Sequence, residues 1–261
     1  MKISCVTYSY VAEPHDFAAT AGQGTAPQGT AEARVLAFVD SVLERLSGGL
    51  LDGLEPWFAH VPANIVTPLL AREIRRRLSA QDLVSAACGG SVGNPAADPD
   101  GCEMWFQVTS MLHAPLIAGD VVSEGLAELA RLCARYRVRV AYENHPEQDV
   151  AEILDRIKGG NDWVGVTLDT GSLAQHGGDP VLAVRQLGTS LMHVHLRDVP
   201  EVGSELSVPI GAGIVDVPGV LTELVQAGYE GWVSIEVPLE TEDPSAAILD
   251  AASMVRRLCD R

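Results

Sequence analysis

Short apolar runs alternate with longer amphipathic segments along most of the chain. The short runs are rich in β-branched and aromatic residues, which is typical of buried strands, whereas the longer segments repeat apolar residues at helical spacing. The predicted strands are residues 3–8, 50–58, 82–87, 115–121, 138–143, 163–169, 191–196 and 232–237. The predicted helices are residues 31–46, 67–78, 102–112, 123–137, 149–158, 180–187, 217–227 and 244–258.

This alternation predicts an α/β fold in which parallel strands are joined by crossover helices. Eight such units in 261 residues favour a single (β/α)8 TIM barrel that spans residues 1–261 as one domain. The structural alternative is an open doubly wound sheet. That fold usually carries a glycine-rich phosphate turn after its first strand, and no such turn follows residues 3–8.

Composition narrows the possible partners and the cellular compartment. A formal net charge of −17 argues against binding to nucleic acid or to an anionic membrane surface, because both need a basic patch. The five cysteines form no CxxC pair, and we find neither a signal-peptide core nor a run of about 18 apolar residues. We therefore expect a cytoplasmic protein with free thiols. The Gly- and Pro-rich segment 13–30 is a hypothetical lid over the pocket.

Polar residues gather where the last four predicted strands end. Glu143, Asn144 and His145 follow the fifth strand, and Asp169 ends the sixth. The seventh strand carries His193 and His195 on one face, because strand side chains repeat every two residues, and Glu236 ends the eighth. The active site of a TIM barrel lies at the carboxyl ends of its strands. We therefore expect these side chains to meet in one pocket.

A cluster of buried carboxylates needs compensation, either by raised pKa values or by a bound cation. Oxygen and imidazole ligands together suit one divalent metal ion: Mn²⁺, Mg²⁺, Co²⁺ or Zn²⁺. We expect only one of His193 and His195 to bind the ion. The other would support it from behind or contact the substrate.

Four stretches carry a resemblance to a known family: ENHP, TLDTG, HVHLRD and IGAGIVDVPGVLTELVQAGYEGWVSIEVP. They resemble the xylose isomerase-like TIM barrels, the sugar phosphate isomerase/epimerase superfamily whose fold is shared with AP endonucleases. The similarity covers residues 123–261 well. It implies one divalent metal held by Glu143, Asp169, His195 and Glu236.

The resemblance also implies an activity. In the ketose epimerases of this family, two glutamates exchange a proton beside a carbonyl through a metal-stabilised enediolate, and Glu143 and Glu236 would be that catalytic pair. A sugar or polyol isomerase or epimerase is therefore the main expectation. A lyase, either a dehydratase or a C-glycoside deglycosidase, is the alternative. A non-catalytic sugar-binding or partner subunit is the third candidate.

The sequence also offers candidate residues for contact with the substrate. We expect a small carbohydrate-like molecule, with His145, His193, Arg197, His60 and Glu55 as candidate binding residues. Ser172 stands where the family's 3-epimerases carry a histidine, and Glu201 stands where they carry an arginine. The resemblance therefore indicates a class of enzyme, the epimerases, and does not name the substrate. A homo-oligomer, or a complex with a partner subunit, is also compatible with the sequence.

Overall fold

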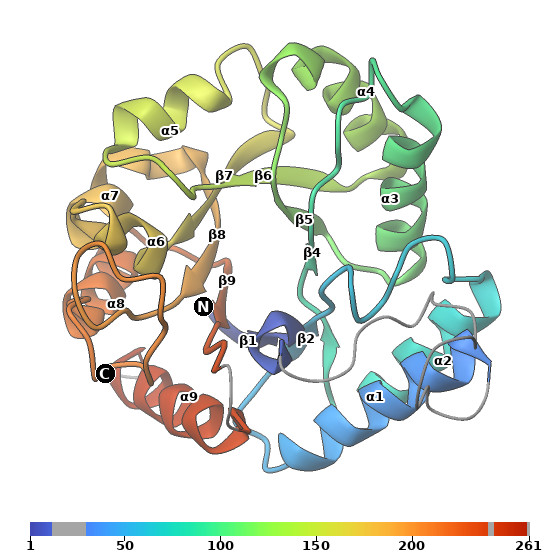
Figure 1. The fold of residues 1–261 in the computed structure, drawn as a ribbon, viewed down its shortest axis with the longest axis horizontal. Coiled ribbons are helices and arrows are strands. Elements are labelled where there is room, and N and C mark those ends of the chain that lie inside the picture. Colours follow the sequence, from blue (N-terminus) through green and yellow to red (C-terminus); the bar gives the residue numbers. More distant parts are fainter. Residues whose placement is uncertain (12–29, 240–242, 260–261) are drawn as a thin grey trace.

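The computed structural model describes residues 1–11, 30–239 and 243–259, and it is a barrel of parallel strands ringed by helices (Figure 1). The strands are β1 (Lys2–Val6), β2 (Gly53–Glu55), β3 (Val84–Ser85), β4 (Cys88–Gly89), β5 (Leu116–Gly119), β6 (Arg139–Glu143), β7 (Val164–Asp169), β8 (Leu191–Leu196) and β9 (Trp232–Ile235). The helices are α1 (Ala31–Arg45), α2 (Pro68–Ser79), α3 (Pro99–Met111), α4 (Leu126–Tyr136), α5 (Val150–Arg156), α6 (Thr170–Gln175), α7 (Pro180–Leu187), α8 (Val217–Gln226) and α9 (Ser245–Cys259). Nearly all of the hypothetical lid lies outside the described residues.

The predicted TIM-barrel class is confirmed. Every pair of neighbouring strands is parallel, in the order β3-β2-β1-β9-β8-β7-β6-β5-β4. The predicted third strand, residues 82–87, contains only β3, which pairs with β2; β4 lies just beyond it and pairs with β5. A parallel bridge between Trp57 and Gly89 brings the two edges of the sheet together. The two short strands thus share one position in the barrel wall.

Two glycines allow the ends of β4 and β5 to approach closely. Gly90 and Gly119 have φ angles of +151° and +153°, which side chains disfavour. A Cβ on Gly119 would lie 1.9 Å from the carbonyl oxygen of Gly90, so no other residue fits there without moving the backbone. The Gly90 N–H donates to the Ala118 carbonyl at 2.8 Å. This close contact shapes one side of the barrel mouth.

The apolar core lies between the barrel wall and the helices. Helix α2 is an example of a helix that covers this core. Thr67 caps its first turn by accepting from the Leu70 N–H at 3.2 Å, and Pro68 fits the first helical position. Its apolar face then buries Leu70 and Ile74 against the sheet, while its arginines face outward. Within the described residues, no helix is long and apolar enough to cross a membrane.

The barrel interior is unusually polar for a core. Its fully buried polar side chains, contributed by five different strands, are Ser4, Glu55, Thr167, His193 and Ser234. Buried polar groups are costly unless they are hydrogen-bonded. Ser4 and Ser234 satisfy each other at 3.0 Å, and the Thr167 hydroxyl donates to the Ala141 carbonyl at 3.3 Å. This polar layer lies directly behind the pocket.

Candidate metal centre and active-site pocket

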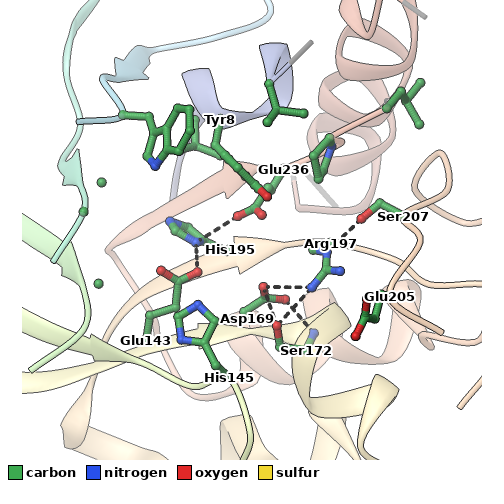
Figure 2. Close-up of a pocket in the computed structure, with 18 of the residues that line it drawn as sticks. Tyr8, Glu143, His145, Asp169, Ser172, His195, Arg197, Glu205, Ser207 and Glu236 are labelled. Carbon is green, nitrogen blue, oxygen red and sulfur yellow. Dashed lines mark hydrogen bonds and ion pairs between the residues drawn. The ribbon is translucent and has the colours of Figure 1, made fainter. Parts of the chain in front are cut away.

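A pocket of about 950 Å³ opens at the carboxyl ends of the strands. One side is aromatic and carries Tyr8, Trp57 and Phe58, whose neighbouring rings meet edge to face at 4.8 and 4.9 Å. The opposite side is polar: in Figure 2 the Tyr8 ring faces Asp169 and Arg197 across the cavity. Such a pocket offers an apolar surface for a ring and hydrogen bonds for hydroxyl groups.

Three of the predicted ligands converge in this pocket. Glu143 ends β6, His195 lies on β8, and Glu236 directly follows β9. His195 Nδ1 lies 2.6 Å from Glu143 Oε1 and 3.0 Å from Glu236 Oε2. One ligand atom from each residue falls within 4.8 Å of the other two. Figure 2 shows the imidazole between the two carboxylates, an arrangement of oxygen and nitrogen donors that suits a divalent ion.

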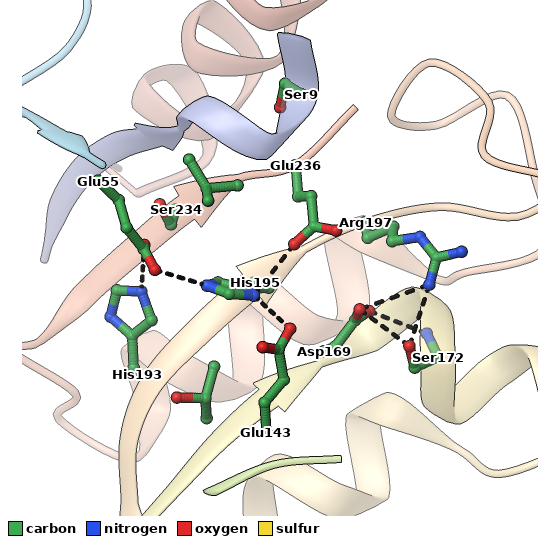
Figure 3. Close-up of polar contacts among 12 residues, drawn as sticks. Ser9, Glu55, Glu143, Asp169, Ser172, His193, His195, Arg197, Ser234 and Glu236 are labelled. Atoms are coloured by element: carbon green, nitrogen blue, oxygen red, sulfur yellow. Dashed lines mark hydrogen bonds and ion pairs between the residues drawn. The ribbon is translucent and has the colours of Figure 1, made fainter. Parts of the chain in front are cut away.

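The other nitrogen of the same imidazole points away from the pocket, to β2 (Figure 3). His195 Nε2 lies 3.0 Å from Glu55 Oε1, and His193 Nε2 lies 2.8 Å from Glu55 Oε2. Glu55 and His193 are both fully buried. One carboxylate therefore joins both histidines of β8.

The electrostatics of this cluster favour a positive charge at its centre. Burial alone would lower the pKa of His195, but the surrounding carboxylates, Glu143 and Glu55 foremost, raise it well above its usual value. Burial raises the pKa of Glu236, although His195 partly opposes the effect. A metal ion can supply the same positive charge as the proton on His195.

Asp169, the fourth predicted ligand, lies in the pocket wall but has other partners. Its Oδ1 accepts from the Ser172 N–H at 2.8 Å, which caps the short helix α6. Its Oδ2 accepts from the Ser172 hydroxyl at 2.9 Å and faces Arg197 Nη1 at 3.4 Å. The structure therefore brings together three of the four predicted ligands and directs Asp169 toward Arg197. Helix α6 itself was not predicted from the sequence.

His145 and Arg197 both line the pocket, as their proposed contact with substrate requires. Burial tends to lower the pKa of His145, but Glu143 and Asp120 raise it overall. Arg197 is held in place by Ser172 and Ser207: its Nη1 donates to the Ser172 hydroxyl at 3.0 Å and its Nε to the Ser207 hydroxyl at 2.8 Å. Arg197 therefore joins the β7 end to the loop that follows β8.

That loop, residues 199–216, is organised by one buried carboxylate. Asp198 Oδ1 accepts from the N–H groups of Val199 and Val215, and Oδ2 accepts from those of Gly211 and Gly213, all at 2.9–3.0 Å. A Cβ on Gly213 would lie 2.1 Å from the Val199 carbonyl oxygen, so glycine is required at this position. The IGAG run of the sequence is thus the part of the loop that folds around Asp198.

Glu55, His60 and His193 were candidate substrate-binding residues, and for His193 a place behind the metal ligand was the alternative. They are fully buried, and none of them lines the pocket. His60 stacks on Phe38 at 4.1 Å, and its Nδ1 lies 3.2 Å from the Thr7 hydroxyl, which accepts from the Trp57 N–H at 2.7 Å. The expected direct contact of these residues with substrate is therefore corrected: they lie behind the residues that a substrate would reach.

Several pocket residues were missed in the sequence. Tyr8 lies in a 3₁₀ turn after β1 rather than in the predicted strand, and Trp57 follows Pro56, which ends β2 early. Glu205 and Ser207 belong to the long loop after β8, where no periodic pattern indicates which side chains face inward. The one usable signal was position, since both aromatic residues lie at the carboxyl end of a predicted strand.

The fold and the site define a TIM barrel with a candidate metal centre at the carboxyl ends of its strands. The model of the xylose isomerase-like TIM barrel family matches residues 111–258, which are more than half of the chain. The chain therefore belongs to this family, and the resemblance seen in the sequence is confirmed.

Among curated proteins, an inosose dehydratase of Clostridium botulinum strain Eklund 17B is 30% identical to this chain over 175 residues, which cover 56% of this chain and 57% of that protein. The chain thus spans little more than half the length of this relative. Among solved structures, the IOLI protein with a bound zinc atom superimposes with a TM-score of 0.72 at 14% identity, covering 100% of this chain and 98% of that one. A D-psicose 3-epimerase has a TM-score of 0.68 at 17% identity, with full coverage of both chains. At these identities the structural matches support the fold alone.

Proposed function

We propose that this protein is a metal-dependent lyase that removes water from a polyhydroxylated ketone, a keto-polyol. The observation that carries the proposal is the convergence of Glu143, His195 and Glu236 in a pocket with one aromatic and one polar side. The similarity to an inosose dehydratase favours elimination over epimerisation. Sugar chemistry on this scaffold fits the family, but the dehydration step is our inference.

The donor set suits a divalent ion. Glu143 and Glu236 supply carboxylate oxygens, and His195 directs Nδ1 between them. Asp169 would complete four ligands if its carboxylate turned from Arg197 toward this centre. When bound, such an ion would polarise the substrate carbonyl and stabilise negative charge that develops on its oxygen.

The chain's own residues can carry the two protons of a dehydration. Glu236, a carboxylate whose pKa burial raises, removes the proton from the carbon beside the carbonyl. The electrons of that C–H bond form a C=C bond as the C–O bond to the neighbouring hydroxyl group breaks. His145 gives its proton to the departing hydroxide, so water leaves and no oxidant is consumed. Arg197 and Ser207 hold the substrate hydroxyl groups.

Ketose epimerisation is the second candidate. Glu143 and Glu236 approach from different strands, and two carboxylates on opposite faces of one carbon could remove and return a proton. Ser172 weighs against a close copy of the family's 3-epimerases, because its hydroxyl binds Asp169 and Arg197 and supplies no imidazole. Both candidates share the first step, which is proton removal beside a carbonyl.

One experiment separates the candidates. The Mn²⁺- or Co²⁺-loaded protein is incubated with inososes and ketohexoses in deuterated water, and the products are examined by mass spectrometry and NMR. Loss of one water supports the lyase. An unchanged skeleton with deuterium on carbon supports the epimerase. If the sugar binds but neither change occurs, the protein is a non-catalytic sugar-binding protein, and both candidate activities are overturned.

A further inference from the structure

A buried carboxylate behind the pocket has no part in the proposed proton transfers. Glu55 comes from β2, which β1 and β9 separate from β8, the strand of the two histidines that it contacts. Its side chain is fully buried, and Gly89 lies between it and the pocket: a Cβ on Gly89 would lie 3.4 Å from Glu55 Oε1. A substrate cannot reach this carboxylate, whose hydrogen bonds go to the two histidines and which forms with them a second group of possible metal ligands.

We propose that Glu55 is a positioning residue, which selects the tautomer of His195 that can bind the metal. The inference rests on the proposed metal site and assigns one buried residue to it. Figure 3 shows the arrangement: the Glu55 carboxylate lies on one side of the His195 ring, and Glu143 and Glu236 lie on the other.

The two nitrogens of the His195 imidazole face different carboxylates. Glu55 Oε1 accepts from His195 Nε2 at 3.0 Å, so Nε2 carries the hydrogen. A neutral imidazole with its hydrogen on Nε2 has its lone pair on Nδ1. His195 Nδ1 is the nitrogen that faces Glu143 and Glu236, at 2.6 and 3.0 Å. Glu55 therefore aims the lone pair at the metal position and also fixes the plane of the ring.

His193 binds the second oxygen of Glu55 and so helps to fix the carboxylate. Its Nε2 donates to Glu55 Oε2 at 2.8 Å, and its buried Nδ1 has no hydrogen-bond partner among the described residues. Within the described residues, the His193 side chain thus directs its hydrogen bonding at Glu55 alone. With one oxygen bound to each histidine, the carboxylate cannot rotate without breaking a buried hydrogen bond.

Glu55→Gln tests this role with little change in volume. An amide has one acceptor oxygen and one NH₂ donor, so it cannot accept from both imidazoles. Thr167→Val is the matched control, because Thr167 pairs with His193 in the neighbouring strand and its buried hydroxyl contacts only the Ala141 carbonyl in the described structure. The measurement is the dissociation constant for Co²⁺, by competition with a chromophoric chelator, together with the visible spectrum of the bound ion. Circular dichroism establishes that each variant is folded.

We expect Glu55→Gln to bind Co²⁺ about 10–100-fold more weakly than the wild type and to change the Co²⁺ spectrum. Thr167→Val should keep both the affinity and the spectrum. Nitrogen-15 NMR of the Zn²⁺-loaded wild type should show the His195 hydrogen on Nε2. If Glu55→Gln fails to fold, His193→Phe keeps the test open, since it removes the donor to Glu55 and should weaken Co²⁺ binding to a smaller degree.

The outcomes separate this inference from the function on which it rests. A wild-type protein that takes up no divalent ion overturns the proposed metal-dependent lyase, and the role of Glu55 with it. A wild type that binds Co²⁺, beside a folded Glu55→Gln variant with the same affinity and spectrum, overturns the positioning role alone. Hydrogen on Nδ1 in the Zn²⁺-loaded protein would also overturn it.

Discussion

The two halves of the barrel contribute different parts of the site. The half from β6 to β9 supplies the candidate metal ligands, Glu143, Asp169, His195 and Glu236. The half from β1 to β5 supplies the aromatic side of the pocket, and the one carboxylate that is buried among its described residues, Glu55, lies behind the pocket. The family match, residues 111–258, covers all four of these candidate ligands and none of the pocket's aromatic residues Tyr8, Trp57 and Phe58.

This difference separates reaction from recognition. Chemistry shared across a family depends on the strand ends that hold the reacting groups, whereas shape is set by loops that vary around them. We therefore expect changes in the β6–β9 half to reduce turnover and changes in the aromatic side to reduce substrate affinity. The following predictions test that separation, from the largest expected effect to the smallest.

Glu236→Gln should have the largest effect. It removes the proposed base and one candidate metal ligand while keeping the size of the side chain, so kcat should fall about 10²–10⁴-fold. Steady-state kinetics with the keto-polyol substrate measures this loss. Glu230→Gln, an exposed residue before β9, is the control and should leave kcat unchanged. A Glu236→Gln protein that turns over like the wild type would contradict the assignment of chemistry to this half.

Asp198→Asn should cost about 2–4 kcal/mol of unfolding free energy. The carboxylate accepts four backbone N–H groups, whereas the amide presents NH₂ to two of them, and hydrogen bonds to a buried charge are the stronger kind. Urea unfolding measures the change. Asp216→Asn is the matched control, because Asp216 caps α8 through one exposed bond and asparagine caps helices equally well. Equal stability losses in both variants would contradict the role of Asp198.

Trp57→Ala should raise KM about tenfold, which corresponds to about 1.4 kcal/mol of lost binding, and should leave kcat nearly unchanged. The indole forms part of the aromatic side and makes edge-to-face contacts with Tyr8 and Phe58. The Co²⁺ affinity should also stay as in the wild type, because no metal-ligating atom is removed. A large fall in kcat with constant KM would break the proposed separation of the two halves.

The same asymmetry explains what could be read from the sequence. Strand–helix alternation indicated the barrel, and polar residues at strand ends indicated Glu143, Asp169, His195 and Glu236, because the barrel brings such ends together by geometry alone. By contrast, the close approach of Gly90 to Gly119 at the ends of β4 and β5 is a tertiary contact. No local pattern indicates that two residues 29 positions apart will meet.

Side-chain direction was the other limit. Glu55, His60 and His193 are fully buried, because Glu55 and His193 bond to each other inside the barrel and His60 stacks on Phe38. Asp169 likewise ends its strand as expected, yet its rotamer is set by Ser172 and Arg197, which come from α6 and from β8. Sequence thus predicts which strand ends meet, and packing decides which atoms do.

The smallest expected effect concerns the ENHP turn, which carries Glu143 and His145 into the pocket. Glu147 holds this turn: Oε2 accepts from the His145 N–H at 3.1 Å, and Oε1 accepts from the Tyr142 hydroxyl at 2.7 Å and from Arg156 Nε at 2.8 Å. Burial alone would raise the pKa of Glu147, but these hydrogen bonds, that of Tyr142 foremost, lower it overall. We expect Glu147→Gln to lose about 1 kcal/mol of unfolding free energy at pH 7, a modest value because Arg156 is half-exposed.

The dependence on pH distinguishes the charge from the shape of Glu147. A carboxyl whose pKa is lower in the folded than in the unfolded chain stabilises the fold above its unfolded pKa of about 4.3, and this contribution is lost as pH falls through the folded pKa. The difference between wild type and Glu147→Gln should therefore be present at pH 7 and shrink toward zero below pH ~3. Glu128→Gln, which removes an exposed pair with Arg131, should show little difference at either pH. If the stability loss of Glu147→Gln persisted undiminished in acid, the turn would depend on the shape of the Glu147 side chain. The position of Glu143 would then not depend on the charge of Glu147.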